Sequence, residues 1–250
     1  MDHFADGDET SMWHQTTVDM KLIGEGVHRV YATLIDGKSC VKKQFVFDQG
    51  EVSEGFTREV NALRTLAHQH IVPLLAVSWQ SLVGWVALPR YQHTLFEARM
   101  NIDPEWEGQL ESAVSYAHDC GFTHRDLKPS NVMISFTGDA VLCDWDASVY
   151  TGDKLTEIRT NPICSLPYRA PELLWNQSDM EYDPYKLDLW SLGCVLWFMR
   201  LGKAPFEGHD EGSLLAVIMM AVDDVSRGTI TGVPSDLTRF CNICPDQRTL

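Results

Sequence analysis

The sequence has few basic residues and no long apolar run, and both shortages restrict what the protein can be. It carries 20 lysines and arginines against 35 aspartates and glutamates, a formal charge of −15. Such an excess of negative charge argues against a protein that binds nucleic acid or an anionic membrane, and it is compatible with a basic peptide as substrate or partner. The most apolar stretch, Leu187 to Leu201, is interrupted by Asp188 and Arg200 and is too short to span a bilayer.

The sequence also lacks an even number of cysteines, as a complete set of disulfides would need, and a signal-peptide pattern. The seven cysteines are an odd number spread from Cys40 to Cys244, which is typical of reduced thiols in an intracellular protein. Residues Met1 to Thr10 are acidic and lack the charged-then-apolar pattern of a signal peptide. We therefore expect residues 1–15 to form a disordered tail, and the protein to work in the cytoplasm, the nucleus or both.

The bulk composition is that of a globular protein. A chain of 250 residues is one large domain or two small lobes, and it is long enough to bury a substantial core. Its 44% hydrophobic and 22% charged residues are ordinary for that class.

The most informative stretch runs from Thr123 to Asn131. Within it, Asp126 can accept a proton from an attacking hydroxyl, Lys128 can hold a phosphate that is being transferred, and Asn131 can hold a metal ion. These are the needs of phosphoryl transfer, which depends on positioning and charge neutralisation more than on covalent chemistry. A lone His-Arg-Asp tripeptide would be read as a helix end and a charged turn, but the full string is far more specific.

This stretch resembles the catalytic loop of eukaryotic protein kinases of the serine/threonine type, with Asp126, Lys128 and Asn131 as its catalytic residues. The resemblance covers about Lys21 to Leu250 and implies an α+β, two-lobed fold. Residues 16–91 are expected to form the hinge and an N-lobe with a small antiparallel sheet and one helix. Residues 92–250 are expected to form a mainly helical C-lobe, in which the last helix of the family is absent.

The start of the expected N-lobe has the pattern of a β-hairpin. Lys21 to Lys43 contains two apolar runs around Asp36-Gly37, a strong hairpin signal. Gly24-Glu25-Gly26, with Val30 after it, resembles the glycine-rich loop that covers the phosphates of ATP, although two glycines alone are a weak signal. Arg29 stands where the third glycine belongs, in a loop one residue short. It either adds a phosphate contact or stiffens the loop and weakens nucleotide binding.

The resemblance also implies a lysine–glutamate pair for the nucleotide. Lys42 fits the register of the family's phosphate-positioning lysine, with Cys40 against the adenine. The spacing of apolar residues predicts a helix over Glu51 to Leu66. Glu59 on this helix would by default be a solvated surface charge, but the run from Arg58 onward is similar to the cyclin-dependent kinases and makes Glu59 the partner of Lys42.

The adenine side of the site is expected at a strand and hinge over Trp85 to Tyr91. The resemblance makes Leu88 the residue that limits access to the back of the pocket, and Arg90 and Tyr91 the source of backbone contacts to adenine. Met133, on a later strand, is expected to pack beneath the adenine.

Asp144-Trp145-Asp146 stands where kinases have Asp-Phe-Gly. The resemblance makes Asp144, together with Asn131, a ligand of Mg²⁺. Asp146 replaces a glycine, which forfeits backbone freedom and adds a second carboxylate near the metal. It either raises metal affinity or perturbs the switch between active and inactive states.

The polar segment from Thr151 to Tyr168 is expected to be the activation segment. Thr160 stands in the register of a regulatory phosphothreonine, whose phosphate would bring Arg58 and Arg125 together through charge-assisted hydrogen bonds. Ser165 takes the place of a threonine that bridges Asp126 and Lys128 in the family. Arg169, directly before Ala-Pro-Glu, suggests proline-directed substrates, but Pro167 replaces the tryptophan common in the cyclin-dependent kinases, so the substrate specificity stays open.

The sequence thus predicts a cyclin-dependent-kinase-like enzyme that uses ATP and Mg²⁺ to phosphorylate protein substrates, with a cyclin-like or other activating protein as a candidate partner. The alternative is a pseudokinase, a nucleotide-binding scaffold or regulator, supported by Asp146 and Arg29. A third hypothesis, phosphotransfer to a small molecule, is disfavoured by the Ala-Pro-Glu segment and the apolar helix that starts near Asp188, which build a peptide platform in the family.

Overall fold

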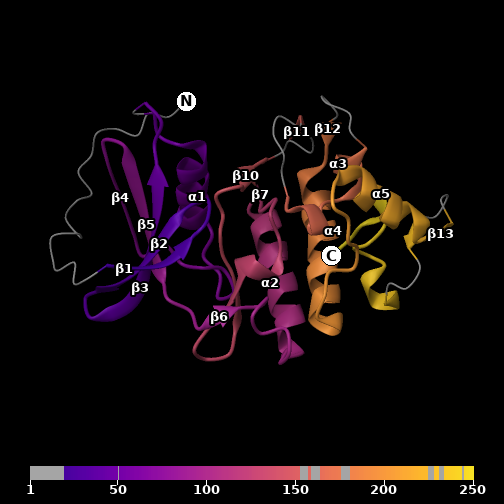
Figure 1. Cartoon of the computed structure of the whole chain (residues 1–250), viewed down its shortest axis with the longest axis horizontal. Coiled ribbons are helices and arrows are strands. Elements are labelled where there is room, and N and C mark those ends of the chain that lie inside the picture. Colours follow the sequence, from indigo (N-terminus) through magenta and orange to yellow (C-terminus); the bar gives the residue numbers. More distant parts are fainter. Residues whose placement is uncertain are drawn as a thin grey trace.

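The computed structural model of the protein describes residues 20–49, 51–152, 157–158, 164–175, 181–224, 228–230, 234–243 and 245–250. Two lobes lie side by side, a β-sheet lobe formed by the first third of the chain and a mainly helical lobe formed by the rest (Figure 1). The α+β, two-lobed architecture predicted from the sequence is therefore confirmed.

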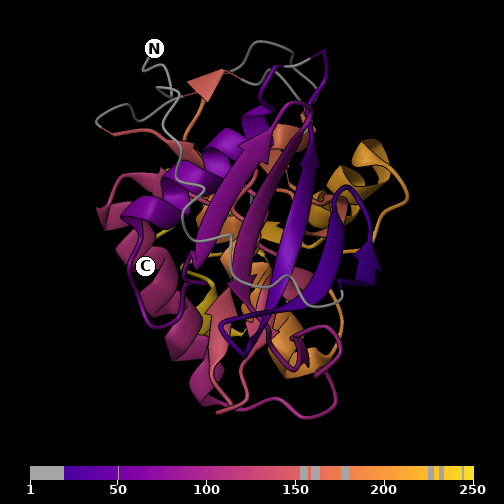
Figure 2. The same cartoon turned by 90° about the vertical axis from the view of Figure 1, so that its left-hand side faces the viewer.

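The smaller lobe is built on one antiparallel sheet with the strand order β1-β2-β3-β5-β4, which faces the viewer in Figure 2. Its strands are β1 (Lys21–Glu25), β2 (Arg29–Ile35), β3 (Lys38–Val46), β4 (Ala76–Gln80) and β5 (Val83–Pro89). The predicted Asp36-Gly37 turn joins β2 to β3, and both residues have positive φ, 50° and 74°. Two such residues give a tight turn whose twist matches that of the flanking strands.

Helix α1 (Glu54–Thr65) lies between this sheet and the helical lobe (Figure 1). It begins three residues later than predicted, because the Ser53 side chain accepts a hydrogen bond from the backbone N–H of Phe56 and caps the helix there. Phe56 and Val60 on its inner face join the core. The same buried face carries Glu59, which has no exposed surface.

The larger lobe is organised around a central buried helix, α4, which is enclosed on almost every side. This burial explains why its sequence is apolar all round. The Asp183 side chain caps its start and Gly202, with φ 72°, ends it. The helices of this lobe are α2 (Glu105–Asp119), α3 (Pro171–Leu174), α4 (Pro184–Leu201) and α5 (Glu211–Met220).

Short strands in the larger lobe carry the loops that face the smaller lobe. The three-stranded sheet β6-β8-β9 and the pair β7-β10 hold in place the segments on either side of Asp126 and of Asp144. The strands are β6 (His93–Thr94), β7 (Phe122–Thr123), β8 (Val132–Ile134), β9 (Ala140–Leu142), β10 (Val149–Tyr150), β11 (Glu157–Ile158), β12 (Glu181–Tyr182), β13 (Val222–Asp224) and β14 (Thr229–Ile230). The 3-10 helices are η2 (Pro129–Asn131), η3 (Leu166–Tyr168), η4 (Ser235–Leu237) and η5 (Pro245–Gln247).

Within the described residues, every helix is too short or too polar to cross a bilayer. The six cysteines in that part of the chain are all free thiols, among them Cys40, Cys143 and Cys164.

Candidate active site

A cavity of about 750 Å³ lies between the two lobes. Its walls come from the β1–β2 turn, β3 and α1 above, from the segment after β5 at one end, and from the loops after β7 and β9 below. Predicted site residues that line it are Gly24, Gly26, Val30, Glu59, Leu88, Arg90, Tyr91, Asp126, Lys128, Asn131, Met133 and Asp144. Segments that are far apart in sequence thus meet around one cavity.

The roof of the cavity is the turn between β1 and β2. Gly24 and Gly26 contribute backbone to it, and no atom lies within 4 Å of where a Cβ on Gly26 would be, so the turn is open there. Glu25, predicted to bind nucleotide, does not line the cavity; its carboxylate accepts a hydrogen bond of 3.1 Å from Arg29 Nε on the solvent side. The Arg29 side chain is 58% exposed, so in this structure it makes a surface ion pair, which contributes little to stability.

The predicted pairing of Lys42 with Glu59 is wrong, because the neighbouring Lys43 pairs with Glu59 and lines the cavity. Lys43 Nζ lies 2.8 Å from Glu59 Oε2 and also donates to Asp144. Lys42 does not line the cavity. Successive side chains of a strand point to opposite faces, so an error of one residue moves a side chain to the wrong side of the sheet.

The same one-residue error affects Cys40. It was predicted to lie against the adenine, but it is fully buried away from the cavity, with its thiol donating to the carbonyl of Thr33. Val41 lines the cavity instead and pairs in register with Leu88 on β5. The wall of the adenine end is therefore aliphatic.

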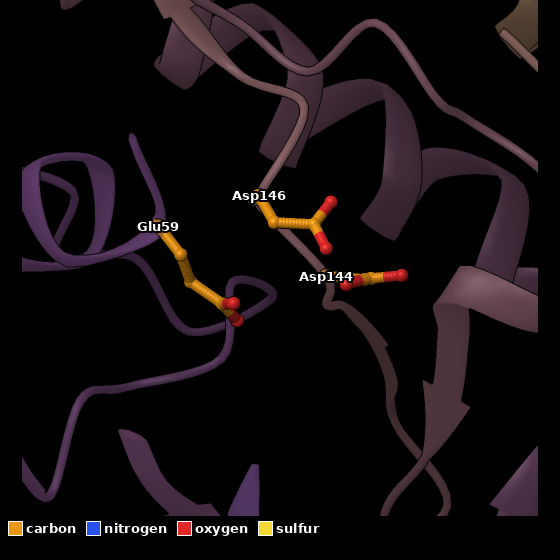
Figure 3. Close-up of side chains that lie close together, drawn as sticks. All are labelled: Glu59, Asp144 and Asp146. Carbon is orange, nitrogen blue, oxygen red and sulfur yellow. The ribbon is translucent and has the colours of Figure 1, made fainter. Parts of the chain in front are cut away.

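Three carboxylates surround the ammonium group of Lys43. Glu59 comes from α1, while Asp144 and Asp146 follow β9, and their side chains converge (Figure 3). One oxygen from each lies within 4.8 Å of the others. Burial alone would lower the pKa of Lys43, but the three negative charges outweigh it and raise that pKa, so Lys43 stays charged.

The cluster holds more negative than positive charge, and this imbalance affects the pKa of Glu59. Burial raises the pKa of Glu59 to about 7, with Lys43 opposing the rise and Asp144 and Asp146 adding to it. Its second carboxylate oxygen, Oε1, is buried and has no hydrogen-bond partner. An oxygen-rich site with surplus negative charge fits a hard divalent cation such as Mg²⁺. Of the two predicted ligands, Asp144 belongs to this cluster, and Asn131 also lines the cavity.

The hinge end of the cavity follows β5. Leu88, Arg90 and Tyr91 line it, and Met133 lines the opposite wall. Cys143 lies beside them, and burial, reinforced by the charge of Asp144, raises the pKa of its thiol well above the ordinary value. Such a thiol is protonated and unreactive at neutral pH.

The catalytic loop is held by hydrogen bonds around Asp126. Lys128 Nζ donates to Asp126 Oδ2 at 2.6 Å, and both the backbone N–H and the hydroxyl of Ser165 donate to Oδ1 at 2.9 Å. Lys128 also reaches Ser165 Oγ at 3.0 Å, so the predicted bridge is present. Burial would raise the pKa of Asp126, but these donors lower it, so the carboxylate stays ionised.

Asp188, in the central helix α4, fixes the backbone of this loop from below. Its carboxylate accepts the N–H groups of His124 at 2.7 Å and Arg125 at 2.8 Å. The imidazole of His118 on α2 is 3.0 Å from the same carboxylate. The strained positive φ of Arg125, 65°, is tolerated because these bonds hold it.

The Asp144-Trp145-Asp146 segment is anchored by its aromatic residue. Trp145 is fully buried and its ring centroid lies 4.7 Å from that of His124, which links this segment to the catalytic loop. The positive φ in this segment falls at Asp144, 66°, and not at Asp146. The backbone freedom of glycine is therefore not required at position 146 in this conformation.

The predicted regulatory residues are only partly described. Thr160 lies outside the described residues. Arg58 pairs with Glu54 on its own helix at 2.8 Å, whereas Arg125 is buried and donates to the carbonyl of Ala147 and the hydroxyl of Tyr182. That a phosphate at position 160 joins the two arginines stays a prediction.

Two features of the site were missed by sequence reasoning. His28, on the β1–β2 turn, lines the cavity and lies 3.0 Å from Asp146. Cys164 has a positive φ of 62°, and its carbonyl accepts hydrogen bonds from the guanidinium of Arg169 at 3.2 and 2.8 Å. The sequence signal for His28 was its place in the glycine-containing turn, but nothing in the sequence named its partner.

Most of the chain is similar to known protein kinases. The family model of the protein kinase domain matches residues 18–244. A probable cell division protein kinase of Encephalitozoon cuniculi is 30% identical over 237 residues, which cover 90% of this chain and 71% of that protein. The CTD kinase subunit alpha of Schizosaccharomyces pombe is 30% identical over 81% of this chain and 36% of that protein.

A third relative, cyclin-dependent kinase 12 of Caenorhabditis elegans, is 29% identical over 84% of this chain and 31% of its own length. The chain thus spans about a third of the length of the last two relatives.

Proposed function

As this chain belongs to the protein kinase family and is a serine/threonine kinase near the cyclin-dependent branch, we propose that it transfers the γ-phosphoryl group of ATP to a serine or threonine hydroxyl of a protein. The observation that carries the proposal is the ionised Asp126, held by Lys128 and Ser165 at the edge of the cavity. This geometry leaves a carboxylate able to orient a hydroxyl and accept its proton.

Each wall of the cavity has a role in this reaction. ATP with Mg²⁺ supplies the transferred group and neutralises its charge. Asn131 and Asp144 would hold the metal, Lys43 would hold phosphate oxygens, and Lys128 would neutralise charge near the accepting hydroxyl. The backbone around Arg90 and Tyr91 would hold the adenine.

The substrate preference proposed is for a hydroxyl that is followed by proline. Cys164 directly precedes Ser165, which contacts Asp126, so the residue after the accepting hydroxyl would lie close to Cys164. The Cys164 carbonyl is already bonded to Arg169, and Arg169 is itself paired with Glu211. A backbone N–H arriving there would lack this acceptor and lose its hydrogen bonds to water, whereas proline has no N–H to satisfy.

A second candidate function, a nucleotide-binding pseudokinase, is favoured by one observation. Asp146 Oδ2 lies 3.1 Å from Lys43 Nζ and competes with phosphate oxygens for that ammonium group. If this competition dominated, the chain would bind partners and turn over slowly or never.

The test is transfer of ³²P from Mg²⁺-ATP to a generic basic protein by the wild type, Asp126→Asn and Asp146→Gly. We expect transfer by the wild type and a fall of about 10³-fold in Asp126→Asn, because the asparagine amide cannot accept the proton. A thermal unfolding midpoint close to that of the wild type would show that the variant is folded. Silence of all three proteins would move the assignment to the pseudokinase, and activity of Asp146→Gly alone would make Asp146 a brake.

Partners and regulation follow from the same resemblance. One relative is named as an alpha subunit, so that relative is part of an assembly. The proposal for this chain includes a cyclin-like or other activating protein, phosphorylation of Thr160 as a second control, and action inside the cell in the cytoplasm, the nucleus or both.

A further inference from the structure

A side-chain contact joins the roof of the cavity to the segment that follows β9. His28 Nε2 lies 3.0 Å from Asp146 Oδ2, across a sequence separation of 118 residues. Both side chains are mostly buried, 19% and 23% exposed. The same oxygen accepts a hydrogen bond from Lys43 Nζ at 3.1 Å, so Asp146 Oδ2 is an acceptor and His28 Nε2 is its second donor.

His28 is also fixed from its other side. Its ring centroid lies 4.1 Å from that of Phe45, a fully buried residue on β3. Phe45 in turn packs edge-on against Phe56 of α1, with centroids 5.5 Å apart. The imidazole is thus held between an aromatic wall and a carboxylate, while it still lines the cavity. A side chain packed on two sides has lost most of its rotamer freedom, so the turn that carries it is held as well.

Asp146, at the other end of the contact, is also held by its neighbours. The same oxygen, Oδ2, accepts from His28 and from Lys43 Nζ at 3.1 Å. A Cβ added to Gly55, at the start of α1, would lie 3.5 Å from the Cβ of Asp146. The first turn of α1 therefore presents no side chain where Asp146 packs. Figure 3 shows Asp146 directed to the same space as Asp144 and Glu59.

The geometry points to a positioning pair: His28 and Asp146 hold the β1–β2 turn closed over the phosphate end of the cavity, next to Lys43. The pair compensates for a turn in which Arg29 replaces a glycine and points to the surface ion pair with Glu25. This inference rests on the proposed nucleotide site, but not on phosphoryl transfer itself. It assigns to Asp146 a role in binding phosphate groups through His28, not a role at the accepting hydroxyl.

The test measures binding of two ligands by titration calorimetry: Mg²⁺-ADP, which has phosphates, and adenosine, which has none. We expect His28→Ala to weaken Mg²⁺-ADP binding about tenfold, the order of one charge-assisted hydrogen bond, and to leave adenosine binding within twofold. The matched control is Arg29→Ala, at the next residue, which begins β2. Because Arg29 faces solvent, that variant should bind both ligands within twofold of the wild type.

A double-mutant cycle shows whether His28 acts through Asp146. In an Asp146→Ala background, the further change His28→Ala should alter Mg²⁺-ADP affinity less than twofold, because the partner is already gone. Tighter Mg²⁺-ADP binding by His28→Ala, an equal loss for adenosine, additive losses in the cycle, or absence of nucleotide binding by the wild type would each overturn the inference. A wild type that binds Mg²⁺-ADP in the expected pattern but transfers no phosphate would overturn the proposed function and leave the pair standing.

Discussion

The catalytic loop and the phosphate end of the cavity are built in different ways. The contacts of Asp126 with Lys128 and Asn131 stay within six consecutive residues, and one buried aspartate, Asp188, fixes the backbone beneath them. At the phosphate end, the contacts of Lys43 and His28 with Asp144 and Asp146 cross more than 100 residues of sequence. Apart from the contacts of Ser165, the first site is local in sequence and follows the family pattern, whereas the second depends on how two lobes meet and contains the departures.

The largest expected effect tests the corrected identity of the lysine. Lys43→Met should lower phosphoryl transfer at least 100-fold, because the phosphates lose their ammonium and Glu59 loses its partner. Lys42→Met should stay within about threefold of the wild type, since Lys42 lies outside the cavity. Initial rates of ³²P transfer at saturating substrate distinguish the two variants.

The adjacent lysines make this a matched pair of substitutions on one strand. Equal losses in both variants would contradict the assignment and would point to damage of β3 itself. A larger loss in Lys42→Met would restore the register predicted from the sequence.

The difference between the two sites explains which of their features could be predicted from the sequence. The roles around Asp126 could be proposed from nine consecutive residues, since the spacing within a short loop limits where its side chains go. Adjacent lysines on a strand gave no such limit, because the choice between Lys42 and Lys43 depends on the pairing register of β3.

The contact between His28 and Asp146 was beyond sequence reasoning for a further reason. Asp146 was recognised as a departure, and its expected neighbour was a metal ion. Its partner lies in another lobe, and no local pattern of a single sequence encodes which residue of a turn faces a loop 118 residues away. The hairpin, the helices and the buried apolar helix α4 were predictable because their signals repeat within a few residues.

A second prediction concerns the choice of substrate at the catalytic loop. A basic peptide with Ser-Pro should be phosphorylated at least tenfold faster than the same peptide with Ser-Ala, because the carbonyl of Cys164 is occupied by Arg169. Comparing kcat/KM for the two peptides measures the preference. The Arg169→Lys variant, with one donor group in place of the guanidinium fork, should narrow the ratio. Equal rates for both peptides in the wild type would remove the proline preference.

The last prediction compares one carboxylate from each site through the pH dependence of stability. The folded pKa of Glu59 is about 7, above the value near 4.3 expected in the unfolded chain. The folded state therefore binds an extra proton between these values, and the stability that this supplies is lost as the pH rises toward 7. Relative to Glu59→Gln, which has no such proton, the free energy of unfolding of the wild type should fall by about 3 kcal/mol from pH 4 to pH 8.

Asp126 should show the opposite sign, because its folded pKa is lowered. Its contribution is present above the unfolded pKa, near 3.9, and is lost as the pH falls through the folded pKa. Relative to Asp126→Asn, the wild type should therefore gain stability as the pH rises from the acid range to about 5 and then stay level. Urea unfolding at a series of pH values measures both differences. Parallel slopes for the two carboxylates would mean that the surplus negative charge around Lys43 is neutralised in solution, and that the two sites differ in sequence locality but not in electrostatics.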